Sequence, residues 1–197
     1  QNNKEFLVVD GGAGIGASWL SRWDSLRLFT PTEYNNLPGL KFDASKGYYP
    51  NKYEVDNYFK SYVEHFEIPI QFNTLISSVR KNENGLFTLT HSDGEIEAKN
   101  VIVATGPFHT PYSPPCHIKI ASEITQMHSN FYKSVDQLQS GDALVVGAGD
   151  SGYQILDEVS KDKSRTVYFS GLTNVKSIPQ QFLGKTLWWW FSLIGFL

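Results

Sequence analysis

Residues 143–156 read ALVVGAGDSGYQIL, and this stretch decides the fold of the chain. Its apolar start predicts a strand, and the apolar residues that recur after the turn predict a helix. Gly147, Gly149 and Gly152 lie between the two in the pattern G-x-G-x-x-G. In such a turn the first glycine allows the bend, the second lets the backbone approach a pyrophosphate, and the third lets strand and helix pack closely. Residues 166–169 supply a second strand, so the stretch predicts a dinucleotide-binding unit, the alternative being an ordinary glycine-rich turn.

A second glycine stretch, residues 12–17, passes for G-x-G-x-x-A. An independent fingerprint there would need a helix and then a second strand ending in an acid about 20 residues on. Residues 31–50 are instead rich in proline, asparagine and glycine, which predicts a loop. We therefore favour residues 6–9 as the second strand of a dinucleotide fold, with Asp10 as the acid that hydrogen-bonds a ribose. The independent fingerprint remains the alternative.

Composition sets limits on the function. The 197 residues are 41% hydrophobic and 19% charged, with a net charge of −3, which gives no support for nucleic-acid binding. The single cysteine, Cys116, excludes an internal disulfide framework, and no signal peptide opens the sequence, so we expect a cytoplasmic protein. The apolar tract 187–197 is too short to span a bilayer and predicts a buried or interface helix. Spacing alone predicts no catalytic residue and no metal-ligand cluster.

The middle of the chain carries three further patterns. Residues 55–66 have the apolar spacing of an amphipathic helix. Residues 75–98 alternate short apolar runs with the turn sequences NENG and SDG, which predicts an antiparallel β-meander. Residues 101–106, VIVATG, predict a buried parallel strand that ends in a glycine turn.

Several motifs, taken in chain order, resemble the flavin-dependent monooxygenase family. This family includes flavin-containing monooxygenases, plant YUCCA-type enzymes and bacterial NAD(P)/FAD-dependent oxidoreductases. The matching stretches are residues 16–19, 22–31, 49–50, 104–108, 128–132 and 147–152.

The resemblance implies an α/β fold with two dinucleotide-binding, Rossmann-like domains and an inserted β-meander, truncated at both ends. Residues 1–108 would form part of an FAD-binding domain and residues 109–197 part of an NAD(P)H-binding domain. The implied cofactors are FAD and NADP, as NADPH. In this family NADPH reduces the flavin, which reacts with O₂ to oxygenate a small organic substrate.

The resemblance also implies the site residues. Those expected to bind FAD are Asp10 at the ribose, Gly16, Ser18 and Trp19 along the flavin, and Val79 at the adenine through its backbone. Those expected to join the two domains are Ala104, Thr105 and Gly106, and those expected to hold the NADPH pyrophosphate are Gly147, Gly149, Ser151 and Gly152. For Trp19 the alternative is plain core packing.

The sequence departs from the family in two places that bear on function. Residues 1–9 are all that precede Asp10, so the first strand and pyrophosphate loop of the FAD domain are missing, which predicts a fragment that binds FAD poorly alone. Leu172 stands where relatives commonly carry an arginine for the NADP 2′-phosphate, so NAD is not excluded. A non-oxygenating flavoprotein reductase and a non-catalytic nucleotide-binding remnant are the alternative functions.

Overall fold

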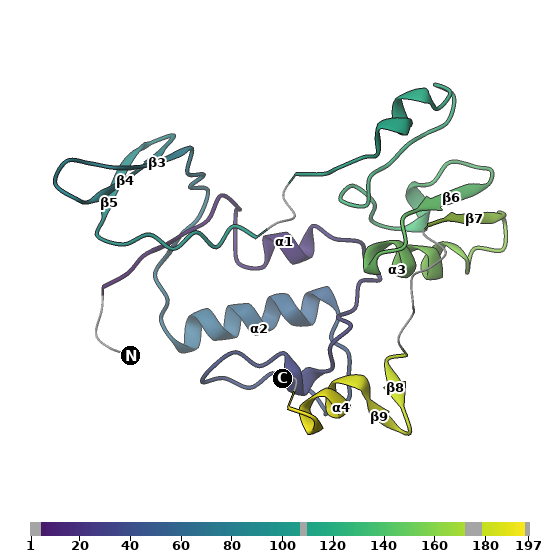
Figure 1. The fold of residues 1–197 in the computed structure, drawn as a ribbon, viewed down its shortest axis with the longest axis horizontal. Helices are drawn as coiled ribbons and strands as arrows, with labels where there is room; N and C mark the ends of the chain where they lie inside the picture. The colour runs from purple at the N-terminus through teal and green to yellow at the C-terminus, as the bar shows by residue number, and fades with distance from the viewer. Residues whose placement is uncertain (1–4, 107–109, 172–178, 196–197) are drawn as a thin grey trace. The chain divides into compact units, whose positions relative to one another are not determined.

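The structure, a computed structural model, describes residues 5–106, 110–171 and 179–195 of the chain (Figure 1). Its contacts divide the chain into two compact units. Unit 1 comprises Gln1–Ser18 and Phe59–Pro111, and unit 2 comprises Trp19–Tyr58 and Tyr112–Leu197. Each unit is built from segments that lie far apart in the sequence, and the boundary between the units falls inside helix α2.

Unit 1 begins with a pair of parallel strands. β1 (Val8–Val9) pairs with β2 (Ile70–Gln71). Hydrogen bonds extend the pair beyond the strand ends, because the Asp10 amide donates to the Gln71 carbonyl at 3.0 Å and the Thr74 amide donates to the Asp10 carbonyl at 2.9 Å. The expected strand in residues 6–9 is therefore present, and Asp10 directly follows it.

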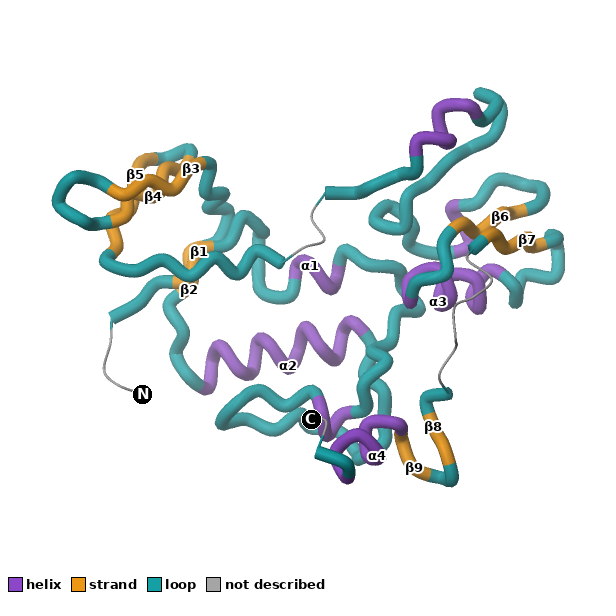
Figure 2. The backbone as a smooth tube through the Cα atoms, viewed as in Figure 1, coloured by secondary structure: helices purple, strands orange, loops and turns teal. Residues whose placement is uncertain are grey.

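The rest of the sheet structure in unit 1 is an antiparallel meander, which confirms the prediction for residues 75–98. β3 (Ser78–Lys81), β4 (Phe87–His91) and β5 (Gly94–Ala98) pair in that order, and Figure 2 shows the three strands in orange. The turns work because Gly85 (φ 83°) and Gly94 (φ 148°) adopt backbone conformations that favour glycine.

The predicted buried strand at residues 101–106 is wrong. The structure assigns no strand there, and Ile102 and Val103 are 91% and 75% exposed. A strand requires a hydrogen-bonded neighbour, and the part of unit 1 that the structure describes offers none to these residues. Their apolar composition predicted a buried strand, but the described residues contain no neighbouring strand that could pair with it.

Helix α2 (Lys52–His65) confirms the helix expected at residues 55–66 and starts three residues earlier than expected. A capping box sets this start. Asn51 Oδ1 accepts from the Glu54 amide at 3.0 Å, and the Glu54 carboxylate accepts from the Asn51 amide at 2.8 Å. The reciprocal pair satisfies two amides that the helix itself leaves without partners.

Unit 2 contains the strand–turn–helix–strand predicted from the opening stretch. β6 (Ala143–Val146), α3 (Asp150–Val159) and β7 (Val167–Ser170) follow in order, and β6 pairs with β7 in parallel. The apolar face of α3 belongs to the core of the unit. The buried members of that core are Trp23, Leu26, Tyr132, Ile155 and Val159.

The remaining elements are short. They are α1 (Ala17–Leu20), the 3₁₀ turns at Thr32–Tyr34, Pro115–Lys119 and Val135–Gln137, and the C-terminal β8 (Gln181–Phe182), β9 (Lys185–Thr186) and α4 (Leu187–Leu193). The helix expected at this end is present, but α4 has no buried residue and Leu193 is 63% exposed, so only the interface alternative stays a prediction. Among the described helices, none has the length and apolar character needed to cross a membrane.

Candidate functional site

The turn between β6 and α3 brings together the four residues predicted to hold a pyrophosphate. Gly147 has a φ of 112°, a conformation that a side chain rarely adopts, and its amide donates to the Ser170 carbonyl at 2.8 Å. The turn is thereby tied to the end of β7. Ser151 and Gly152 lie in the first turn of α3, directly after the N-cap Gly149.

The three glycines of this turn have different structural requirements. A Cβ at Gly152 would lie 2.0 Å from the Gly147 carbonyl oxygen, so the close packing of turn and helix needs glycine there. A Cβ at Gly149, with φ −88°, would meet no atom within 4 Å. The fold therefore does not require glycine at Gly149. The space a side chain would fill there lies beside the helix N-terminus.

The N-terminus of α3 is suited to an anion. The first amides of a helix have no partner inside the helix, and the helix dipole makes that end positive. Gly149 brings no side-chain oxygen to cap those amides. Asp150 places a carboxylate in the same turn, which favours the helix but opposes a negatively charged ligand.

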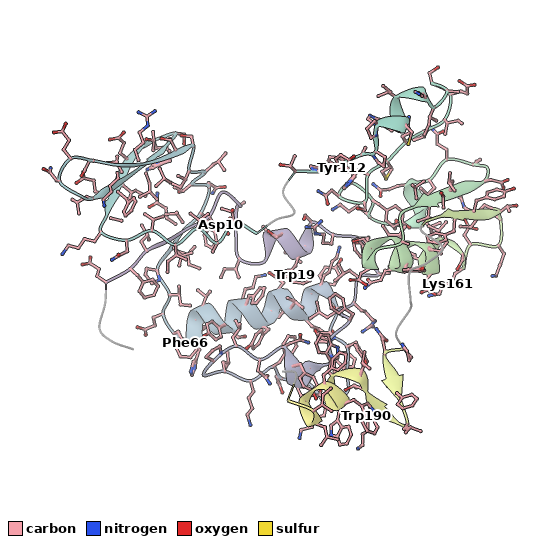
Figure 3. All side chains as sticks on the ribbon, viewed as in Figure 1. Asp10, Trp19, Phe66, Tyr112, Lys161 and Trp190 are labelled. Atoms are coloured by element: carbon pink, nitrogen blue, oxygen red, sulfur yellow. The ribbon has the colours of Figure 1, made fainter. Side chains whose placement is uncertain are left out.

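The second predicted region lies in unit 1 around Asp10, which Figure 3 labels. The exposed Asp10 carboxylate accepts from the Gly12 amide at 2.6 Å, and the Gly12 carbonyl accepts from the Asn73 amide at 2.9 Å. These bonds hold the start of the glycine stretch against the segment after β2. A Cβ at Gly14 would meet no atom within 4 Å. The acid thus stands at the end of a parallel strand, where a ribose-binding acid is expected.

Gly16, Ser18 and Trp19 lie at α1, the short helix after the glycine stretch. Gly16 has a φ of 71° and turns the chain into the helix. Trp19 is half-buried and packs against the core cluster of unit 2, which agrees with the alternative role expected for it. Its predicted place along a flavin stays a prediction.

Val79, predicted to bind FAD, and residues 104–106, predicted to join the two domains, lie in unit 1. Val79 is in β3, an edge strand of the described meander, so one side of its backbone has no strand partner there. Ala104 and Thr105 are exposed, and Gly106 turns the chain with a φ of 70°. Leu172, considered for nucleotide preference, lies outside the described residues.

Unit 2 contains a buried charge that no sequence pattern predicted. Lys52, at the start of α2, is 2% exposed. Its Nζ donates to Asp24 Oδ1 at 2.6 Å and to the Arg22 carbonyl at 2.8 Å. Lys52 therefore fixes the segment that follows Trp19. No local pattern marks a lysine for burial, because its partners lie about 30 residues earlier in the chain.

Burial raises the pKa of two tyrosines of unit 2. Burial raises the pKa of Tyr132 well above 10, and the adjacent Glu158 carboxylate, which accepts from its hydroxyl at 3.1 Å, raises it further. Burial also raises the pKa of Tyr49, with a smaller contribution from Glu33. Both groups are protonated at neutral pH. In the described residues, no group of three or more metal-ligating side chains is found.

Residues 1–180 match the model of a known protein family. That family is described as pyridine nucleotide-disulphide oxidoreductase, and the match covers most of the 197 residues. The chain belongs to this family. Its members share the dinucleotide-binding α/β architecture that the opening glycine stretch predicted, so the prediction of the fold class is confirmed.

Individual relatives agree with this assignment. Over all 197 residues the chain is 42% identical to the uncharacterized CzcO-like oxidoreductase of Geobacillus kaustophilus, of which it covers 56%. It is 33% identical over 184 residues to the probable indole-3-pyruvate monooxygenase YUCCA1 of Arabidopsis thaliana, covering 90% of the chain and 44% of that protein. The chain spans about half the length of the curated relatives it matches.

Solved structures point to the same group. The flavin-containing monooxygenase from Stenotrophomonas maltophilia superposes with a TM-score of 0.76 at 25% identity, covering 88% of this chain and 59% of that one. The bacillithiol disulfide reductase Bdr from Bacillus cereus, at 20% identity and a TM-score of 0.70, shares the fold. The resemblance to flavin-dependent monooxygenases is therefore confirmed. The expected cofactor pair, FAD and NADP, agrees with this family.

Proposed function

We propose that the chain forms the nucleotide-binding part of an FAD- and NAD(P)H-dependent, monooxygenase-type oxidoreductase of the cytoplasm. Residues 1–108 would contribute to FAD binding, and residues 109–197 to NAD(P)H binding. When bound and reduced, the flavin supplies the O₂ chemistry that oxygenates a small organic substrate. The chain's own residues bind and orient the two nucleotides. Family membership and the ordered motifs support this proposal.

The observation that carries the proposal is the open position at Gly149. Gly147 and Gly152 are glycines that the turn itself needs, whereas a Cβ at Gly149 would meet no atom within 4 Å. A pyrophosphate that approaches the amides of the first turn of α3 would use that space. In this role Gly149 provides access, the amides donate to the phosphate oxygens, and the helix dipole offsets part of the ligand's charge.

A second element of the proposal concerns Asp10. Its carboxylate, exposed at the end of β1, would accept hydrogen bonds from the ribose hydroxyls of FAD. The Gly12 amide donates to Asp10 Oδ1 and fixes the orientation of the side chain before the ribose arrives.

Disulfide reduction by the residues of this chain is disfavoured. A dithiol mechanism uses a pair of cysteines, commonly in the spacing C-x-x-C. The chain has one cysteine, the exposed Cys116. The proposal therefore takes the oxygenase members of the family, and not its disulphide reductases, as the guide to the reaction.

The test is the binding of NADPH to the purified chain, followed by the fluorescence of the reduced nicotinamide and repeated with NADH. Replacing Gly149 with valine should weaken binding by tenfold or more, because the side chain fills the space that the pyrophosphate needs. The matched control is Gly14→Val, the same change at an open glycine of the other glycine stretch. It should leave the affinity unchanged.

Two results would contradict the assignment. An unchanged affinity for Gly149→Val would show that the turn after β6 does not hold the pyrophosphate. A loss of binding confined to Gly14→Val would move the site to residues 12–17 and revive the independent fingerprint. Circular dichroism on both variants confirms that each is folded before its affinity is interpreted.

A further inference from the structure

One face of α3 is bonded to a segment more than a hundred residues earlier in the chain. Gln154 Oε1 accepts from the Arg27 amide at 3.4 Å, and Gln154 Nε2 donates to the Arg27 carbonyl at 2.9 Å. The side-chain amide thus pairs with both backbone groups of Arg27, as a neighbouring strand would. Gln154 is half-buried, but Arg27 and both hydrogen bonds are exposed, so water competes with the pair.

Glu158 lies one turn further along the same face. Its carboxylate accepts from the Ser25 hydroxyl, from the Tyr132 hydroxyl at 3.1 Å and from the Val135 amide at 3.3 Å. Three donors from two separate segments therefore meet at one carboxylate. Hydrogen bonds to a charged acceptor are stronger than those between neutral groups.

Apolar packing accompanies these bonds. Ile155 and Val159 of α3 are 8% and 1% exposed and belong to one cluster with Trp23 and Leu26. Polar and apolar contacts thus join the same helix to the same segment, residues 23–27. The opposite end of α3 carries the glycine turn proposed to hold the pyrophosphate.

We propose that Gln154 and Glu158 are positioning residues that make residues 23–27 and the nucleotide-binding turn one cooperative unit. The inference rests on the proposed function, since it concerns the effect of nucleotide binding at Gly149. Residues 23–27 follow Trp19, which the family resemblance places beside the flavin. Through this unit, an occupied nucleotide turn would hold that segment in place without touching it.

The test is amide hydrogen exchange of the whole chain with and without NADP⁺. A ligand that binds only the closed form slows every amide that exchanges through the same opening by the factor 1 + [L]/Kd, about 100-fold at 100 times the Kd. The Tyr153 amide, which donates to the Gly149 carbonyl, reports α3. The Leu26 amide, which donates to the Trp23 carbonyl, reports on residues 23–27, and the Leu28 amide, which donates to the Pro50 carbonyl, reports on the position directly after them.

Each outcome decides the question. Equal slowing of Tyr153, Leu26 and Leu28 is the expected result. Slowing of Tyr153 alone overturns this inference and leaves the nucleotide site standing. If none of the three amides slows with NADP⁺ or with NADPH, both the proposed nucleotide site and this inference are overturned. The wild-type chain alone therefore gives a decisive answer.

Variants identify the residues responsible. In Gln154→Ala/Glu158→Ala the Tyr153 amide should keep its NADP⁺-dependent slowing while Leu26 and Leu28 lose theirs. The single variant Glu158→Gln, which keeps an acceptor oxygen, should retain much of the NADP⁺-dependent slowing at Leu26 and Leu28. Asp157→Ala is the matched control, because Asp157 is exposed on the same helix and its carboxylate pairs only with the exposed Lys161 among the contacts described.

A purely stabilising role gives a different result. It would speed exchange with and without ligand by the same factor and leave the NADP⁺-dependent ratio at Leu26 unchanged. That pattern in the double variant would overturn the assignment to Gln154 and Glu158.

Discussion

The buried Lys52 ammonium should be among the groups on which unit 2 most depends. Replacing Lys52 with methionine keeps an unbranched apolar stem of similar length and removes the charge. Lys52 is 2% exposed, whereas its ion-pair partner Asp24 is 55% exposed. The change therefore leaves the Arg22 carbonyl without its buried donor, while water reaches the Asp24 carboxylate.

The expected loss of stability in Lys52→Met follows from these exposures. A hydrogen bond from a charged donor contributes about 1.5–3 kcal/mol, and three are lost, at Asp24 and at the Arg22 and Leu20 carbonyls, the last of them long at 3.4 Å. Solvation of the exposed carboxylate and relief from burying an ammonium offset part of that loss. We expect the free energy of unfolding to fall by about 2–3 kcal/mol, which at a slope of about 2 kcal/mol/M lowers the urea midpoint by about 1–1.5 M.

Tryptophan fluorescence suits the measurement, because all five tryptophans lie in unit 2. The matched control is Lys161→Met. Lys161 and Asp157 pair at 2.6 Å but are 71% and 70% exposed, so the loss should stay below about 0.5 kcal/mol. Equal urea midpoints for the Lys52 and Lys161 variants would refute the argument that burial increases the contribution of the Lys52 hydrogen bonds to the free energy of unfolding.

Two further predictions concern Tyr132 and Gly152. The pKa of Tyr132 is raised above its ordinary 10.0, so its contribution to stability is fully present below pH 10 and is lost as the pH rises toward the folded-state value. Urea unfolding at pH 8 and pH 11 should show a loss in the wild type that is smaller in Tyr132→Phe; an equal loss would contradict the role of this hydroxyl. Gly152→Ala should lower the free energy of unfolding by about 1–3 kcal/mol, because the Cβ would lie 2.0 Å from the Gly147 carbonyl. Gly149→Ser, whose Cβ would meet no atom within 4 Å, is its control, and similar unfolding midpoints for the two variants would contradict the close packing.

Elements whose causes are local in sequence were predicted well. The meander followed from turn residues, because Gly85 and Gly94 take the positive φ values that such turns need. The β6–α3–β7 unit followed from the glycine pattern and its flanking apolar runs. The buried strand predicted at residues 101–106 was wrong, because an apolar run forms a buried strand only where a second strand is available to pair with it.

The contacts that organise unit 2 could not be predicted. The Gln154–Arg27 pair spans 127 residues, and the Lys52–Asp24 pair spans 28. Neither pair follows a helical or strand period, and the polar residue types involved are ordinarily exposed. Only the tertiary structure brings such groups together, so a sequence pattern gave no signal for them.

The glycine turn shows what geometry adds to a motif. In sequence, Gly147, Gly149 and Gly152 are equivalent letters of one pattern. In the structure, the backbone conformation requires Gly147 and close packing requires Gly152, whereas nothing described in the protein occupies the space beside Gly149. Gly14 is equally open, so an open position alone does not indicate a binding partner, but Gly149 is also the N-cap residue of α3. At a helix N-terminus the best-matched partner is a phosphate group, which is why the binding test falls on Gly149.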